Sequence, residues 1–480
     1  MTTLTQLQPQ AVWYWFEQLC AIPRPTFHEQ ALGHFLMQQA EARGLSAEQD
    51  ARGNVRIHKV ATAGMADRAP VAIQAHMDMV AQKAPDSLHD FARDPIHTRI
   101  DNGWVSAEQT TLGADNGIGL AMGLAVLFEA DMSHPDLTLI VTVEEEVGMG
   151  GAMALSPSWL TMPYLINLDS EEEGRLFIGC AGGRDVNFTL PLRWQAAEGA
   201  ACCVRVEGLQ GGHSGADIHQ GLGNANVLLA RLLASVYEVA PFALADLAGG
   251  ELRNVITREA AATIMLPENQ AAPIVAATAA VLQAELAHTE PNLHISVQAV
   301  DTPLQAASLA DTRRVLDGLL CLPNGVLRMS DVFAGVVETS SSVGVVKTNA
   351  EGVQIHCLMR SLLASPKDAL GQRIEALARL AGATVRFDAD YPGWAPNADS
   401  PLLQQAKVVF ERHFGQAPSL DIIHAGLECG LLSGKAPHLD MVSFGPTITG
   451  AHSPKERVNI ASVAKNWAVL LDLLQHIPKA

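Results

Sequence analysis

Short apolar segments with strand character alternate with helical patterns in the first part of this 480-residue chain. Residues 71–75, 137–143 and 164–168 have the composition of buried strands, and residues 117–130 have a helical pattern. Alternation of strands and helices is typical of an α/β layer fold, in which helices flank a mostly parallel sheet. The sequence therefore predicts an α/β fold for this part of the chain.

Two segments rich in glycine or proline, residues 179–183 and 391–396, divide the chain into three parts. Between them we expect strands followed by long helices, which is typical of an α+β domain; the strands are 201–207, 251–256 and 261–266, and the helices are 224–239 and 272–286. The last part resembles the first again, with a strand at 441–444 between helices at 401–414 and 461–476. We predict a split α/β domain, residues 1–183 and 392–480, with an α+β domain inserted over residues 184–391.

Charge and composition argue against several classes of protein. The formal net charge of −19 argues against a nucleic-acid partner, because such binding needs clustered positive charge. The longest uncharged apolar run, residues 117–128, is shorter than the roughly 20 residues that cross a bilayer. We find no secretory signal, and the seven cysteines include no C-x-x-C pair. We therefore expect a cytoplasmic protein without a disulfide framework and without a membrane partner.

Five polar residues occupy similar places relative to the predicted strands. His76, Glu146 and Asp169 each follow an apolar strand, His452 lies in the loop after strand 441–444, and Asp115 lies in a turn just before a helix. The carboxyl ends of strands in an open parallel sheet meet at one edge, where ligands bind. We expect these five residues to lie together there.

Two histidines and three carboxylates form a ligand set that suits zinc or a similar metal, whereas calcium prefers oxygen alone. Each residue by itself has a simpler interpretation, since a single histidine is more often structural and a run of glutamates is more often a solvated face. Two further carboxylates extend the pattern: Asp78 could orient His76, and Glu145 could act as a general base beside Glu146.

Longer motifs contain these residues. They are His76-Met-Asp78, Thr110-Thr-Leu-Gly-Ala-Asp-Asn-Gly-Ile-Gly119, Glu145-Glu-Val-Gly-Met149, Asp169-Ser-Glu-Glu-Glu-Gly174 and Gly450-Ala-His-Ser-Pro454. With these motifs the chain resembles the bacterial, carnosinase-like dipeptidases of the co-catalytic di-zinc exopeptidase family, which also includes aminoacylases and carboxypeptidases. The resemblance covers essentially the whole chain.

The resemblance implies two Zn²⁺ ions per subunit, with Co²⁺ or Mn²⁺ as possible substitutes. His76 and Asp169 would hold one ion, and Glu146 and His452 would hold the other. Asp115 would bridge the two ions, and its peptide bond to Asn116 would be cis. Asp78 would orient His76 and Glu145 would be the general base, although a one-residue shift in the glutamate run would select Glu144 and Glu145 instead.

The resemblance also implies roles for residues of the second half. His213 would stabilise the oxyanion of the substrate carbonyl, in the active site of a partner subunit, and Asn254 would assist it. Arg360 would bind the C-terminal carboxylate of the substrate, because a guanidinium fork matches a carboxylate. Gly426 would offer backbone contacts. A homodimer formed through the inserted lid domain is thereby implied.

The expected activity is hydrolysis of unblocked dipeptides, including Xaa-His and β-alanyl-histidine, by a water activated at the zinc site. An N-acyl-amino-acid deacylase or an aminotripeptidase of the same family would carry the same metal residues. A non-catalytic binding protein on this fold is the third interpretation, and the presence of all five ligands together with Asp78 and the glutamate pair argues against it.

Overall fold

The computed structural model describes residues 3–129, 132–266 and 271–479. The chain forms two compact units. Unit 1 contains Met1–Gly179, Trp394–Ile422 and Leu427–Ala480, and unit 2 contains Cys180–Gly393 and Ile423–Gly426. In the described part of the chain, no helix is both long enough and apolar enough to cross a membrane.

Unit 1 is built on an eight-stranded sheet in the order β1-β2-β6-β3-β7-β23-β8-β22. The strands are β1 (Ser46–Gln49), β2 (Val55–Lys59), β3 (Val71–His76), β6 (Leu137–Thr142), β7 (Tyr164–Asn167), β8 (Arg175–Cys180), β22 (Ser419–Ile423) and β23 (Asp440–Ser443). The four central strands β6, β3, β7 and β23 pair in parallel, whereas β1, β2 and β8 pair antiparallel. The predicted mostly parallel sheet is therefore confirmed at its centre.

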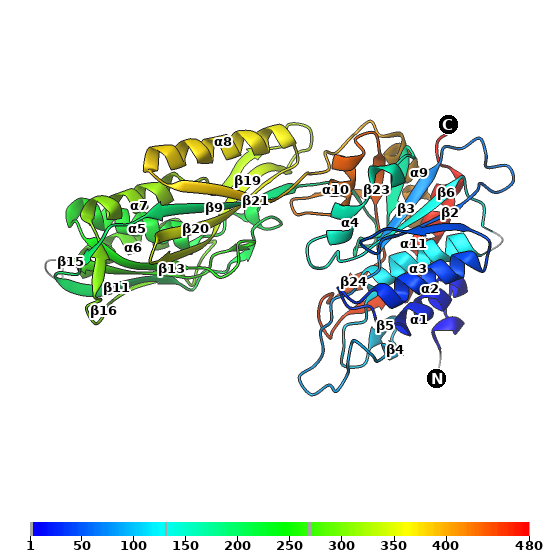
Figure 1. Cartoon of the computed structure of the whole chain (residues 1–480), viewed down its shortest axis with the longest axis horizontal. Coiled ribbons are helices and arrows are strands. Elements are labelled where there is room, and N and C mark those ends of the chain that lie inside the picture. Colours follow the sequence, from blue (N-terminus) through cyan, green and yellow to red (C-terminus); the bar gives the residue numbers. More distant parts are fainter. Residues whose placement is uncertain (1–2, 130–131, 267–270, 480) are drawn as a thin grey trace. The chain divides into compact units, whose positions relative to one another are not determined.

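Helices cover the sheet of unit 1 (Figure 1). They are α1 (Gln10–Cys20), α2 (Gln30–Glu41), α3 (Ala114–Phe128), α4 (Gly150–Ala154), α9 (Pro401–Phe414), α10 (Glu428–Lys435) and α11 (Ile460–Gln475). The predicted helix 117–130 is found as α3, which begins three residues earlier, and Ala130 lies outside the described residues. Glycines bring α3 close to the sheet, since a Cβ at Gly123 would lie 2.7 Å from Leu139 Cδ1.

A small antiparallel sheet in unit 1 joins the C-terminal part of the chain to the segment before α3. Its strands run in the order β24 (Ile448–Thr449), β25 (Arg457–Asn459), β5 (Trp104–Ala107) and β4 (Thr98–Asp101). Val458 on β25 pairs with Val105 on β5. This pairing places the β24–β25 loop, which contains His452, beside the turn that contains Asp115.

Unit 2 is built on an antiparallel sheet in the order β16-β11-β15-β13-β19-β20-β9-β21, with β18 added to β19. The strands are β9 (Gly182–Pro191), β11 (Ala200–Glu207), β13 (Ala243–Gly249), β15 (Ala260–Leu266), β16 (His294–Ala299), β18 (Gly325–Met329), β19 (Val337–Asn349), β20 (Gly352–Ser361) and β21 (Thr384–Tyr391). Figure 1 shows helices on one side of this sheet, namely α5 (Ala225–Val239), α6 (Ala271–Glu285), α7 (Leu309–Cys321) and α8 (Ala364–Ala381). Their apolar residues form the core of unit 2 with inward-facing strand residues such as Phe188 and Ile355.

One predicted strand of unit 2 is wrong over most of its length. Residues 251–254 form a bend and a turn, and only Val255–Ile256 are extended, as β14. β14 pairs with β12 (Gly212–His213) in a separate two-stranded ribbon. The apolar Leu252 that suggested a strand is exposed at this turn.

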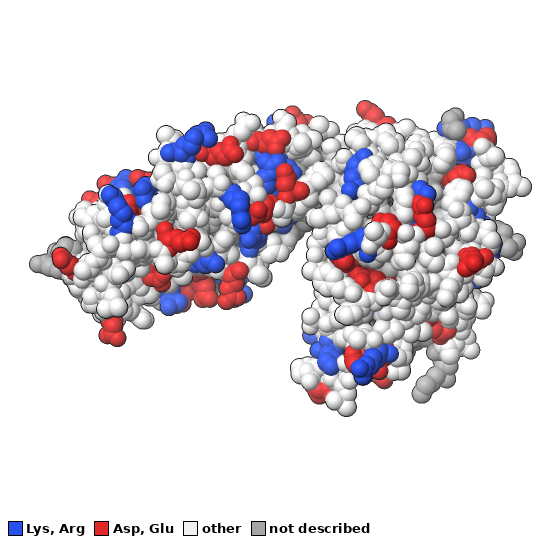
Figure 2. Space-filling model, viewed as in Figure 1, with Lys and Arg blue, Asp and Glu red and all other residues white. Residues whose placement is uncertain are grey.

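Basic and acidic side chains are interspersed on the face of the molecule shown in Figure 2. Ion pairs across elements of the chain include Arg184 with Asp390 at 2.6 Å and Arg412 with Asp472 at 2.8 Å. The acidic net charge of the sequence is therefore spread over the chain as well as gathered at the sheet edge described next.

Candidate metal centre

The carboxyl ends of neighbouring parallel strands carry most of the predicted ligands in unit 1. His76 is the last residue of β3, Glu146 lies in the loop after β6, and Asp169 lies two residues beyond the end of β7. Asp115 lies at the start of α3, in a peptide bond to Asn116 that is cis, as expected. His452 comes from the β24–β25 loop, so all five side chains meet at one edge of the sheet.

Asp115 lies between the two histidines. Its Oδ1 is 3.1 Å from His76 Nε2, and its Oδ2 is 3.2 Å from His452 Nε2. Asp169 Oδ1 approaches the first imidazole at 3.4 Å, and Glu146 Oε2 approaches the second at 3.0 Å. The residues thus form two groups of three ligand atoms that share one carboxylate.

These residues fit divalent cations. Ligands about 2.0–2.2 Å from a tetrahedral ion lie about 3.3 Å from one another, which matches the separation of each histidine from its two carboxylates. Ligand atoms of His76, Asp115 and Glu146 all lie within 4.8 Å of one another. Glu146 Oε1 is buried without a hydrogen-bond partner among the described residues, so this carboxylate keeps an unused acceptor beside the group.

The electrostatics of the protein residues also favour a cation. Hydrogen bonds to Asp115 and Glu146 raise the pKa of His452 to about 11. Burial alone would lower the pKa of His76, but Asp169, Asp115 and Asp78 together raise it well above its ordinary value. The carboxylates therefore hold positive charge on both imidazoles, and a bound metal ion would replace these protons.

Asp78 is fully buried directly behind His76. Its Oδ1 lies 3.4 Å from His76 Nδ1, on the side of the ring opposite the other ligands. The two oxygens of Asp78 accept the backbone N–H groups of Glu145 at 3.1 Å and Glu146 at 3.2 Å. Burial opposes the charge, but the contact with His76 and these hydrogen bonds lower the pKa of Asp78. One carboxylate thus fixes an imidazole and the backbone of the glutamate run.

The three glutamates of the run have different surroundings. Glu144 has a positive φ of 56°, and its carboxylate pairs with Arg52. Glu145 Oε2 lies 4.0 Å from His76 Nε2, and Glu146 contacts His452. Burial raises the pKa of Glu145 well above its ordinary value, and nearby carboxylates raise it further although His76 opposes them. Glu145 and Glu146 therefore face the metal residues, whereas Glu144 is held by an arginine.

Unit 2 holds a second cluster of predicted residues around Gly215. A Cβ at Gly215 would lie 2.9 Å from Arg360 Nε and 3.1 Å from His213 Cε1, so glycine permits their close approach. His213 Nδ1 accepts the backbone N–H of Ala216 at 2.9 Å, and burial followed by repulsion from Arg360 lowers the pKa of His213. A neutral ring whose Nδ1 accepts carries its proton on Nε2, where it can donate.

Arg360 is 4% exposed, and its Nη1 donates to Tyr391 Oη at 3.2 Å. Its Nε has no partner among the described residues. A buried guanidinium with such an unused donor is suited to binding an anion. Asn254 lies exposed at the turn before β14, where its backbone carbonyl accepts the N–H of Ser214 at 2.8 Å. Gly426 ends the short segment Ile423–Gly426 of unit 2.

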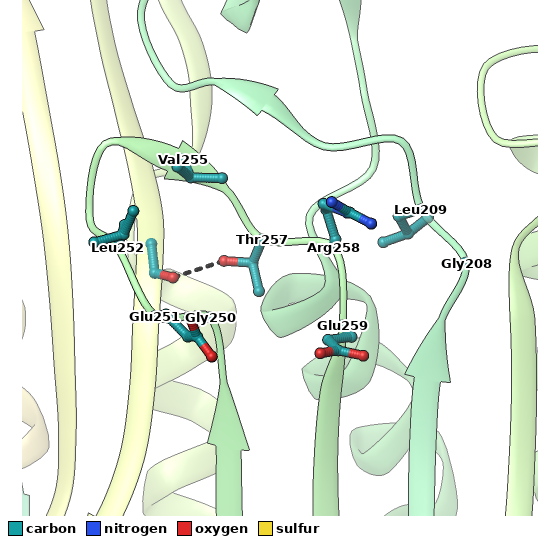
Figure 3. Close-up of a pocket in the computed structure, with 10 residues that line it drawn as sticks. Gly208, Leu209, Gly250, Glu251, Leu252, Val255, Thr257, Arg258 and Glu259 are labelled. Atoms are coloured by element: carbon teal, nitrogen blue, oxygen red, sulfur yellow. Dashed lines mark hydrogen bonds between the residues drawn. The ribbon is translucent and has the colours of Figure 1, made fainter. Parts of the chain in front are cut away.

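A cavity of about 360 Å³ in unit 2 is lined by residues on both sides of Asn254 in sequence, including Leu252 and Val255. Figure 3 shows that the loop from Gly250 to Glu259 lines one side and that Gly208 and Leu209 line the other. Thr257 Oγ1 donates to the carbonyl of Gly344 at 2.7 Å inside it. None of the predicted site residues lines this cavity.

Comparison with known proteins identifies the family. The model of peptidase family M20/M25/M40 matches residues 72–476. This chain belongs to that family. The family resemblance inferred from the sequence motifs is therefore confirmed.

Two known proteins are similar to this M20-family chain over its full length. The cytosol non-specific dipeptidase of Escherichia coli K12 is 47% identical over 484 residues, covering 100% of both chains. The crystal structure of aminoacylhistidine dipeptidase from Vibrio alginolyticus is 42% identical, covers 100% of this chain and 99% of its own, and has a TM-score of 0.95. A tripeptidase from Staphylococcus aureus, at 15% identity over 98% of this chain and 99% of its own, has a TM-score of 0.57 and shares the fold.

Buried residues that were not predicted from the sequence support the candidate metal centre of this M20-family chain. Glu428 is 1% exposed, and its Oε2 accepts Gln74 Nε2 at 2.6 Å and Thr142 Oγ1 at 2.7 Å beneath the ends of β3 and β6. Burial raises the pKa of Glu428 to about 7. Asn116 donates to Asp169 and so orients a ligand. Asn116 lies in the quoted motif of residues 110–119, but its contact, like those of Glu428, depends on side-chain packing that no motif records.

Proposed function

We propose that this chain is a metal-dependent dipeptidase that hydrolyses unblocked dipeptides, including Xaa-His and β-alanyl-histidine. The observation that carries the proposal is the position of Asp115, whose two oxygens face two different histidines, each accompanied by a second carboxylate. The full-length similarity to a non-specific dipeptidase and an aminoacylhistidine dipeptidase supports dipeptides as the substrate class.

Two Zn²⁺ ions are the proposed cofactors, with Co²⁺ or Mn²⁺ as substitutes. His76 and Asp169 would hold one ion, Glu146 and His452 would hold the other, and Asp115 would bridge them. Two ions in such a site supply Lewis acidity and make a bound water more acidic. The nitrogen and oxygen donors present suit zinc and its neighbours in the first transition series.

Glu145 is the proposed general base. Its carboxylate lies beside the ligands without contacting either histidine closely, and burial favours its protonated form once it has accepted a proton. It would take a proton from the attacking water and deliver it to the leaving amine. Asp78 would keep His76 in the tautomer whose Nε2 faces the centre.

The predicted residues of unit 2 would bind the substrate. Arg360 would hold its C-terminal carboxylate through the guanidinium group, and Gly426 would offer backbone contacts. His213 would donate from Nε2 to the oxyanion of the substrate carbonyl, assisted by Asn254. We propose that His213 acts in the active site of a second copy, in a homodimer formed through residues 184–391 as lid and dimerisation domain. Residues 1–183 and 392–480 would form the catalytic domain of a cytoplasmic enzyme.

Metal analysis coupled to a substrate panel tests the proposal. The panel contains Xaa-His and other dipeptides, β-alanyl-histidine, tripeptides and acetyl-amino acids. We expect about two metal ions per chain and hydrolysis confined to unblocked dipeptides. Preferred cleavage of tripeptides or acetyl-amino acids would show that the chain is another amide hydrolase of the family and not a dipeptidase. Full metal content with no hydrolysis of any member would indicate a binding protein.

A further inference from the structure

The buried carboxylate of Glu456 accepts four consecutive backbone N–H groups. Its Oε2 accepts from Leu112 at 2.8 Å and from Gly113 at 3.0 Å. Its Oε1 accepts from Ala114 at 2.7 Å and from Asp115 at 3.2 Å. Glu456 is 2% exposed, so these hydrogen bonds are shielded from water. A single side chain therefore binds the whole turn that leads into α3.

This turn needs an external acceptor for a physical reason. The first N–H groups of a helix have no partner within the helix, and a carboxylate is favoured at that end by the helix dipole. Gly113 takes a left-handed conformation with φ of 71°, and its carbonyl accepts Arg24 Nη2 at 2.6 Å. A Cβ at Gly113 would lie 2.6 Å from that nitrogen, so the turn is held tightly between Arg24 and Glu456.

Glu456 also lies in the loop that carries His452. The loop is internally braced, since the N–H of Glu456 donates to Ser453 O at 3.0 Å and Ser453 Oγ donates to Gly450 O at 2.7 Å. His452 is more than half exposed and has a positive φ of 60°, so packing does little to restrain its side chain. The carboxylate of Glu456 therefore links this loop directly to the backbone of the Asp115 turn.

We propose that Glu456 is a positioning residue that fixes the separation of Asp115 and His452, and thereby the affinity of the ion that these two residues share with Glu146. The inference rests on the proposed two-metal function. Glutamine has nearly the same shape, but its amide would direct an NH₂ group at two of the four backbone donors. The substitution Glu456→Gln therefore breaks half of the contacts without creating a cavity.

The experiment titrates metal-free protein with Zn²⁺ and follows both binding steps by calorimetry. In Glu456→Gln, we expect one step to weaken by about 10–100-fold, the range typical of residues that orient metal ligands. The other step, which depends on Asp115 but not on His452, should weaken less. The matched control is Glu290→Gln in unit 2. Glu290 is also 2% exposed and accepts two backbone N–H groups, from Gln210 and Gly223 at 2.8 Å each, so its loss tests a buried carboxylate remote in sequence from the ligands. Both steps should be unchanged in that variant.

Two wild-type-like steps in folded Glu456→Gln would overturn the positioning role, and so would an equal loss in Glu290→Gln. A wild-type protein that binds fewer than two ions would instead contradict the proposed function. If Glu456→Gln does not fold, the proposal is tested by hydrogen exchange of the metal-free wild-type protein. The amides of residues 112–115 should exchange as slowly as those in the middle of α3, and exchange faster by about tenfold or more would overturn the proposal.

Discussion

The histidines of the two candidate sites, the metal centre of unit 1 and the Gly215 cluster of unit 2, are held in opposite charge states. In unit 1, carboxylates raise the pKa of His452 to about 11 and keep His76 protonated in the absence of metal. In unit 2, burial and then repulsion from Arg360 lower the pKa of His213, and they lower that of His424 to about 3. The same residue type is thus set to share a cation at the metal centre and to remain a neutral donor or acceptor in the Gly215 cluster.

This difference in histidine charge matches two tasks of amide hydrolysis, which are activating a water at a metal centre and binding the substrate with its developing oxyanion. A carboxylate-rich group attracts metal ions and accepts protons, whereas a neutral imidazole beside a guanidinium suits a negatively charged oxygen. The backbone around the site of unit 1 is also held by carboxylates. Asp78 and Glu456 accept N–H groups from the segments that carry the predicted metal ligands. Substitutions at the site in unit 1 should therefore change metal binding or proton transfer. Substitutions at the site in unit 2 should change substrate recognition.

The largest effect should come from Glu145→Gln in unit 1. Removing a general base typically lowers turnover by about 10²–10⁴-fold, and the amide cannot accept the proton. Metal content should stay near that of the wild type, because Glu145 is not a proposed ligand. The neighbouring Glu144→Gln is the matched control: its carboxylate pairs with Arg52, so turnover should be close to normal. A large loss in Glu144→Gln with little loss in Glu145→Gln would reverse the assignment of the two glutamates.

Arg360→Lys tests the substrate side of the comparison. Lysine keeps the positive charge but loses the planar, two-pronged guanidinium that can bind both carboxylate oxygens. A hydrogen bond to a charged group contributes about 1.5–3 kcal/mol, so kcat/KM for dipeptides should fall by roughly 10–150-fold. The loss should appear mainly in KM, with both metal-binding steps unchanged.

A dipeptide with an amidated C-terminus is the internal control for Arg360→Lys, because it has no carboxylate to lose. Wild type should hydrolyse it slowly, and the substitution should change that rate little. An equal loss on the free and amidated dipeptides would show that Arg360 does not recognise the carboxylate.

Asp78→Asn should weaken metal binding by about 10–100-fold, the effect of losing a residue that orients a ligand. The amide can accept one of the two backbone N–H groups but must turn its NH₂ group toward the other or toward His76. Because Asp78 contacts His76 and also accepts the N–H of Glu146, both Zn²⁺ binding steps should weaken in a calorimetric titration, with the larger loss in the step that Glu456→Gln weakens less. The larger loss in the same step for both variants would contradict the division of ligands between two ions.

The sequence predicted the centre of unit 1 well because its pattern is local. His76 and Asp169 follow apolar strands that are adjacent in the sheet, so strand order and parallel pairing bring them together. The contact between Asp115 and His452 could not be predicted from the strand pattern alone. It depends on the small β24–β25–β5–β4 sheet, which was not foreseen. Supporting residues such as Glu456 and Glu428 could not be identified, since an isolated glutamate in a sequence does not reveal which backbone or side-chain donors surround it.

Unit 2 was harder to foresee for a different reason. Its longest hairpin, β19–β20, contains the polar run Thr339–Ser342, which is buried although its composition suggests a loop. Ser340 Oγ lies 2.8 Å from His424 Nε2, so the run is used for side-chain contacts that come from a distant segment. The cluster around Arg360 therefore depends on contacts between residues that are far apart in sequence, which no local pattern encodes.

The smallest expected effect concerns the neutral state of His424, which is 7% exposed and faces Arg360, His213 and His219. Its pKa is about 3 in the folded protein and near 6.5 when unfolded, so between these values the unfolded chain binds the extra proton and stability falls as the pH is lowered. Relative to His424→Asn, which cannot titrate, the metal-free wild type should lose up to about 1.4 kcal/mol per pH unit below pH 6. Hydrogen exchange of the β19 and β20 amides at pH 6 and pH 5 measures this difference in unit 2. Parallel pH dependence in the two proteins would mean that His424 is protonated in the folded state, and the electrostatic contrast between the units would then rest on His213 alone.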